Sequence, residues 1–89
     1  MDRRFVRGKA FNLSLLATAL AEQGEIEQAC AVGSEALDLA AGLQSARSVR
    51  YIRDLQRVLN RRADSAVVRT FSTDVARLLP AGAARAGWR

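Results

Sequence analysis

Residues 13–40 carry two apolar stripes at helical spacing with a break between them, and this pattern constrains the fold more than any other feature of the chain. The first stripe consists of Leu13, Leu16, Ala17 and Leu20. Gln23-Gly24 interrupts it, because glycine accepts the left-handed backbone that ends a helix. The second stripe consists of Ile26, Ala29, Gly33, Ala36, Leu37 and Ala40. Small residues recur where two helices must approach closely, so the pattern predicts a helical hairpin.

The same periodicity continues along the chain and predicts four helices. They are expected at residues 3–23, 25–41, 46–61 and 65–79. Gly42 ends the second helix, and Ser45 and Asp64-Ser65 are suited to cap the third and fourth. The apolar stripes of these last two are Val49, Ile52, Leu55 and Leu59, then Val67, Val68, Phe71, Val75, Leu78 and Leu79. We therefore expect a helical domain over 3–79 and a disordered tail over 80–89.

Several function classes are disfavoured by composition. The 89 residues contain no histidine, which removes the usual general base and the usual metal ligand. No apolar run approaches the ~20 residues of a membrane span, so we expect a cytoplasmic protein without membrane contact. Cys30 is the single cysteine and lies on the apolar side of the second helix, which favours a small buried residue over a reactive thiol. We expect no enzymatic activity, no metal and no cofactor.

Residues 13–41 resemble a tetratricopeptide repeat. The matching positions are Leu13, Leu16, Ala17, Leu20, Ala29, Gly33, Ala36 and Ala41. The small residues agree in type with that family, whereas Gly33 stands where Phe or Tyr is usual and the closing Pro is absent. The resemblance implies an all-α array of helix hairpins, about four helices forming a tetratricopeptide-like α-α superhelix.

A second resemblance lies in the amino-acid identities along one segment rather than in their spacing. The segment from Leu20 to Ala40, followed by Leu43-Gln44-Ser45-Ala46-Arg47, is similar to the C-terminal region of actinobacterial helix-turn-helix transcriptional regulators. The likeness covers roughly residues 5 to 79. It implies a region for protein–protein interaction or ligand sensing within a transcriptional regulator. The DNA-binding domain of that family has no counterpart in these residues.

Two candidate sites lie on the first helix. Tetratricopeptide proteins bind ligands on the concave surface of their first helices, and the resemblance places Lys9 and Asn12 there as a partner groove. The alternative is that both are ordinary exposed polar residues. Phe11 and Leu15 form a second apolar face, which either mediates self-association as a homodimer, binds a partner, or packs against the C-terminal helices.

The positive charge of the chain is concentrated in its second half. The net charge is +5, and residues 45–89 hold ten arginines against three aspartates. Four of them, Arg50, Arg53, Arg57 and Arg61, fall within about 90° of one another opposite the apolar stripe of the third helix. This stripe is either a surface for phosphate or an acidic partner, or a solvated face. A small basic nucleic-acid-binding protein is therefore the alternative function, although no aromatic residue is interleaved with the stripe to stack single-stranded bases.

Overall fold

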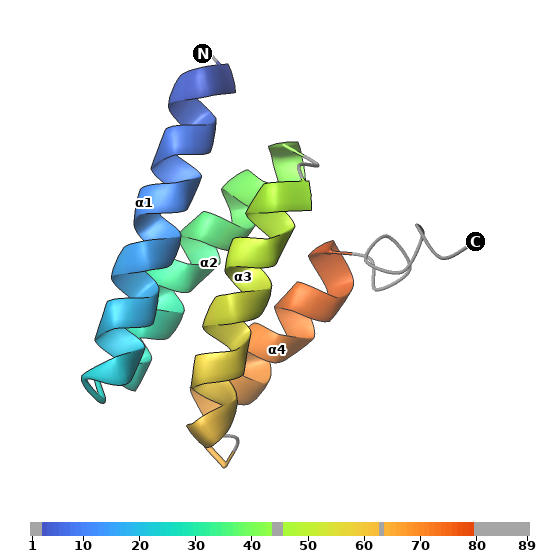
Figure 1. The fold of residues 1–89 in the computed structure, drawn as a ribbon. Coiled ribbons are helices and arrows are strands. Elements are labelled where there is room, and N and C mark those ends of the chain that lie inside the picture. The colour runs from blue at the N-terminus through green and yellow to red at the C-terminus, as the bar shows by residue number, and fades with distance from the viewer. Residues whose placement is uncertain (1–2, 44–45, 63, 80–89) are drawn as a thin grey trace.

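The computed structural model describes residues 3–43, 46–62 and 64–79, and all of their regular structure is helical (Figure 1). The elements are α1 (Arg3–Glu22), α2 (Ile26–Leu43), α3 (Ala46–Leu59), the short 3-10 helix η1 (Asn60–Arg62) and α4 (Ala66–Leu78). The expected all-α array of four helices is thereby confirmed. The predicted cap Ser45 and the predicted tail over 80–89 lie outside the described residues.

The helix ends differ from expectation by one or two residues. α2 continues through Gly42 to Leu43, so the glycine does not end it. α3 ends at Leu59, and Arg61 belongs to η1. Ser65 does precede α4 with an extended backbone, but its hydroxyl makes no capping hydrogen bond to that helix. A glycine can continue a helix as well as end it, and a serine before a helix need not cap it. The sequence alone therefore does not fix these boundaries, because packing decides where the last turn ends.

The turn between α1 and α2 is built as the glycine pattern predicts. Gly24 has a φ of 88°, in the left-handed region that favours glycine. Its N–H donates to the carbonyl of Ala21 at 3.1 Å, and the N–H of Glu25 donates to the carbonyl of Leu20 at 2.9 Å. These two bonds are those of a Schellman motif, which satisfies the last carbonyls of α1 and reverses the chain.

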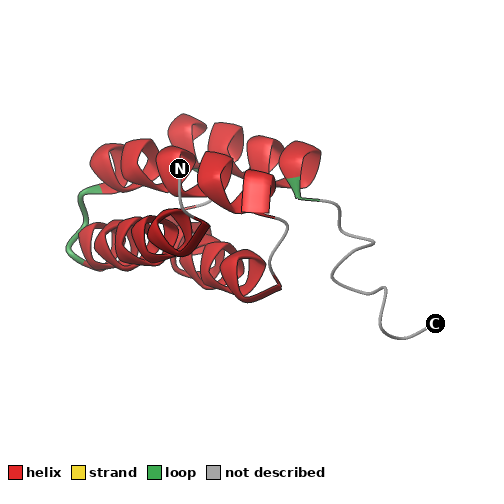
Figure 2. Cartoon of the chain, turned by 90° about the horizontal axis from the view of Figure 1, so that it is seen from above, coloured by secondary structure: helices red, strands yellow, loops and turns green. Residues whose placement is uncertain are grey.

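The helices form two layers. In Figure 1, α1 and α3 lie side by side in front, with α2 and α4 behind them, and Figure 2 shows the two layers from above. α2 contacts α1, α3 and α4, whereas α1 packs on α2 and α3. Each hairpin therefore contributes one helix to each layer, and α2 is the central element.

Small side chains line the contact between α1 and α2. The buried residues of α1 are Ala10, Ser14, Ala17 and Ala21, and those of α2 include Ala29, Gly33, Ala36 and Ala40. The Ser14 hydroxyl donates to the Ala10 carbonyl at 2.8 Å, so this polar group is buried with a partner. Leu16, which the sequence places on one apolar stripe with Ala17, is instead 49% exposed, because α2 packs on the line of small residues.

Large side chains from the second hairpin complete the core. Ile52, Leu55 and Leu59 come from α3, and Val68, Phe71 and Val75 from α4. Two of them meet α2 at Gly33, where an added Cβ would lie 2.8 Å from Leu55 Cδ2 and 3.1 Å from Phe71 Cε1. The glycine that departs from the repeat signature is thus the point at which α3 and α4 both reach α2.

Candidate interaction surface

The large hydrophobic side chains that the described residues leave exposed all lie on α1. Their exposed fractions are 59% for Phe5, 37% for Phe11, 53% for Leu15 and 49% for Leu16. We call these four residues the α1 apolar face. It exists because α1 uses its small residues to pack on α2, which leaves its bulky side chains on the outside. An exposed apolar group of this kind marks an interaction site more often than chance.

Phe11 and Leu15 have different surroundings, although the sequence placed them on one face. The Phe11 ring contacts the Tyr51 ring of α3, with centroids 4.8 Å apart and planes tilted by 51°. Leu15 remains more than half exposed. Packing against α3 therefore covers part of the Phe11 side chain. Leu15 remains available to contact a partner.

Lys9 and Asn12 are exposed, and the structure brings them together. With Phe5, Gly8 and Leu13 they line a shallow pocket of about 340 Å³ on α1. The apolar lining from Phe5 and Leu13 was not part of the predicted groove. Lys9 and Asn12 thus lie at the edge of a pocket whose lining is partly apolar.

The arginine stripe is only partly continuous. Arg50 and Arg57 are exposed on α3, and Arg57 pairs with Asp54 at 3.4 Å. Arg53 is half-buried, and its Nε is shielded from solvent without a hydrogen-bond partner. Arg61 is exposed but follows α3 in η1. An exposed pair such as Arg57–Asp54 adds at most about 1 kcal/mol to stability, so a ligand can displace it at little cost. The guanidinium groups accessible to a ligand are therefore those of the exposed Arg50, Arg57 and Arg61.

A larger pocket lies between α1 and α3. We call it the α1–α3 pocket; its volume is about 770 Å³ and it is lined by Arg7, Gly8, Phe11, Ala46, Arg47, Ser48 and Tyr51. One exposed arginine comes from each helix, with the Phe11–Tyr51 ring pair among the lining residues. Sequence reasoning missed Arg7, Arg47 and Tyr51. The only local signal was the neighbouring pair Arg50-Tyr51, since the juxtaposition with α1 depends on tertiary packing.

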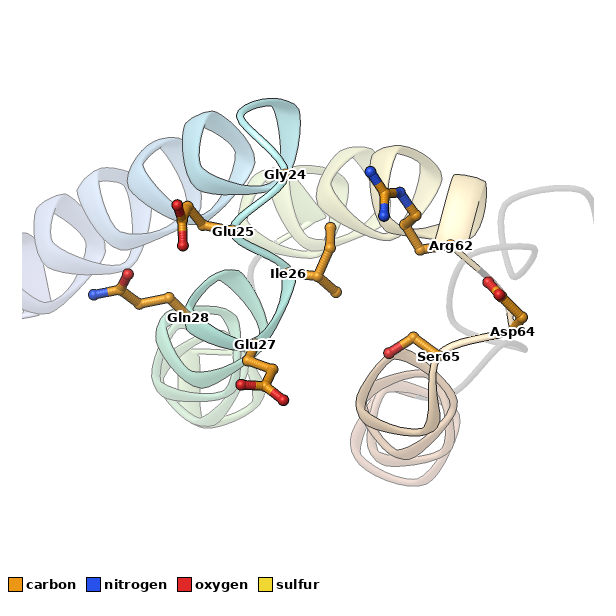
Figure 3. A pocket seen from close by; sticks show the side chains of 8 residues that line it. All are labelled: Gly24, Glu25, Ile26, Glu27, Gln28, Arg62, Asp64 and Ser65. Carbon is orange, nitrogen blue, oxygen red and sulfur yellow. The ribbon is translucent and has the colours of Figure 1, made fainter.

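A third pocket, of about 720 Å³, lies where the α1–α2 turn comes close to the residues that lead from η1 into α4 (Figure 3). Its charged lining residues are Glu25, Glu27, Arg62 and Asp64. Glu25 and Gln28 lie across the start of α2 from Arg62 and Asp64 in Figure 3. Among the described residues no group of three or more acidic, histidine or cysteine side chains could hold a metal ion. The mixed charge gives this pocket no clear ligand preference.

Cys30 is buried in the core, as the sequence predicts. Burial raises the pKa of its thiol, because the desolvated thiolate is disfavoured. The thiol is therefore protonated at neutral pH and serves as a small apolar side chain.

Comparison of the chain with protein-family models, with curated proteins and with solved structures finds no match in any of the three. The relationship to tetratricopeptide proteins and to transcriptional regulators thus stays a prediction. Among the described helices, none is both long enough and apolar enough to cross a membrane.

Proposed function

We propose that this domain is a protein-interaction module, of the kind that the C-terminal regions of helix-turn-helix transcriptional regulators provide. The observation that carries the proposal is the α1 apolar face: the large hydrophobic side chains exposed in the described residues gather on one helix. α3 flanks one side of α1 and α2 lies behind it, so the face is open to a partner.

Physical chemistry favours burial of this face in a complex. Full burial of a leucine side chain stabilises by about 1.5–3 kcal/mol relative to full exposure. Leu15 is 53% exposed, so covering it in a complex gives roughly half of that. Two leucines and two phenylalanines on one helix can therefore anchor an interface of ordinary size. A helical array presents such a surface without a conformational change, because the buried core holds its helices in place.

The proposal is tested by placing a photocrosslinking amino acid at Leu15 in the cell, with the same substitution at Ala31 as a control. Ala31 is exposed on α2 in the other layer. We expect a specific crosslink at Leu15, to an identified partner or to a second copy, that Leu16→Ser removes. Sedimentation equilibrium of the purified chain separates the two outcomes, since only self-association gives a dimer. Equal crosslinking at Leu15 and Ala31 would contradict the proposal.

Nucleic-acid binding is the second candidate, favoured by the exposed guanidinium groups of Arg47, Arg50 and Arg57 on α3. Binding through phosphates releases counterions, so affinity for random duplex DNA should fall steeply with salt. A mobility-shift assay at low and high salt, comparing the wild type with an Arg50→Glu/Arg57→Glu double variant, measures this. Binding that is indifferent to the double substitution would exclude the α3 surface as the site.

A further inference from the structure

Positive charge predominates on the α1/α3 layer, although α1 also carries the exposed acid Glu22, and α4 in the other layer carries exposed Arg69 and Arg77. The exposed cations of the α1/α3 layer include Arg7, Lys9, Arg47, Arg50 and Arg57. The exposed acids of α2, by contrast, are Glu27, Glu35 and Asp38. On the described part of α3 the sole acid is Asp54, and it is already paired with Arg57. The surface beside the α1 apolar face is therefore strongly positive.

We propose that the partner of this module is an acidic amphipathic segment of another protein, seated across the α1–α3 pocket. This inference rests on the proposed function and names the chemistry of the partner. The segment would place carboxylates on Arg7 and Arg47, and an apolar side chain among the rings of Phe11 and Tyr51.

The geometry of the pocket supports both halves of this recognition. Arginine forks bind carboxylates with two parallel hydrogen bonds, and Arg7 and Arg47 present such forks from two different helices. Between α1 and α3 the Phe11–Tyr51 pair supplies apolar surface, and the residue Phe11 is still 37% exposed. At Gly8 no atom lies within 4 Å of the position a Cβ would take, so the pocket is open along the α1 backbone.

A protein segment fits this surface better than a nucleic acid does. Phosphates would satisfy the arginines, but a phosphate backbone offers no apolar surface to the Phe11 and Tyr51 rings that line the same pocket. A helix or extended segment with apolar residues and carboxylates on neighbouring positions covers both kinds of surface at once. Charge complementarity would also speed association and exclude basic competitors.

The test uses a fluorescent peptide of about 16 residues, long enough to form a helix. Its sequence places Leu, Phe and Glu side chains next to one another on a single face of that helix. Two peptides serve as comparisons, one with Lys for each Glu and one with Ser for each Leu and Phe. Fluorescence anisotropy against the full chain should show binding of the first peptide only. Single-stranded and duplex DNA of the same net charge are measured in parallel.

Two kinds of variant separate charge from shape. Arg7→Glu/Arg47→Glu should weaken binding by at least about tenfold, which corresponds to about 1.4 kcal/mol. Gly8→Leu fills the pocket without altering a charge, and we expect a similar loss. Arg77→Glu on α4 is the matched control, because Arg77 is exposed in the other layer and pairs only with Asp74. Thermal melts confirm that each variant is folded.

The inference is overturned if the lysine or serine peptide, or DNA, binds as tightly as the acidic amphipathic peptide. It is equally overturned if the double variant and Gly8→Leu bind like the wild type. Specific crosslinking at Leu15 together with no peptide binding would leave the interaction function standing and remove only the acidic partner. Absence of specific crosslinking at Leu15 would remove the function itself.

Discussion

Ala29→Glu is expected to unfold the domain at room temperature. Ala29 has 0% of its surface exposed and lies on the small-residue line of α2. A carboxylate there would be buried without a partner, which costs several kcal/mol even after the structure relaxes. A chain of 89 residues has a total free energy of unfolding of only about 4–13 kcal/mol, so most of the stability would be lost.

Circular dichroism during thermal and urea unfolding measures this effect, with Ala31→Glu as the matched control. Ala31 is two residues away on the same helix and exposed, so its substitution should change the free energy of unfolding by less than about 0.5 kcal/mol. If Ala29→Glu melted like the control, the packing of α1 on α2 would be wrong.

Gly33→Val should produce the second large loss of stability. The added Cβ would lie 2.8 Å from Leu55 Cδ2 and 3.1 Å from Phe71 Cε1, and the two γ-methyl groups would reach further into the same contact. Overpacking of this kind costs about 1–3 kcal/mol, and displacement of two helices at once places the expected loss at the upper end. Gly33→Ala should cost less, because alanine gains about 1 kcal/mol in helix propensity and the Leu55 methyl can shift.

Gly42→Ala provides the comparison for Gly33, since both glycines are helical residues of α2. No atom lies within 4 Å of the Cβ position at Gly42, so only the propensity gain remains and stability should rise by up to about 1 kcal/mol. Urea denaturation gives the free energy of unfolding for all three variants. A stabilised Gly33→Val would show that α3 and α4 do not meet α2 at this point.

Much of the fold was predictable because its sequence signals are local. The small residues of α2 and the positive φ of Gly24 follow from spacing and from backbone chemistry, and both are found in the structure. The side of α1 on which Leu16 lies was predicted wrongly, since Leu16 is exposed. That helix has apolar residues on two sides, and periodicity alone cannot show which side a neighbouring helix approaches.

The candidate site was predictable only where one helix carries it. Lys9 and Asn12 are one turn apart on α1, and both line one pocket, while their role as a partner groove stays a prediction. The approach of Arg7 to Arg47, and of Phe11 to Tyr51, joins residues about forty positions apart, so it depends on how α3 settles beside α1. No local pattern contains that information, because it arises from the tertiary packing of the second hairpin on the first.

The central position of α2 also determines how force would travel through the domain. α2 contacts each of the other three helices, and at Gly33 an added Cβ would lie within 3.1 Å of both Leu55 and Phe71. Close-packed interiors have low compressibility and transmit displacement rather than absorbing it. We therefore expect α1, α2 and α4 to move together when a partner binds α1, rather than as two hairpins joined by a hinge.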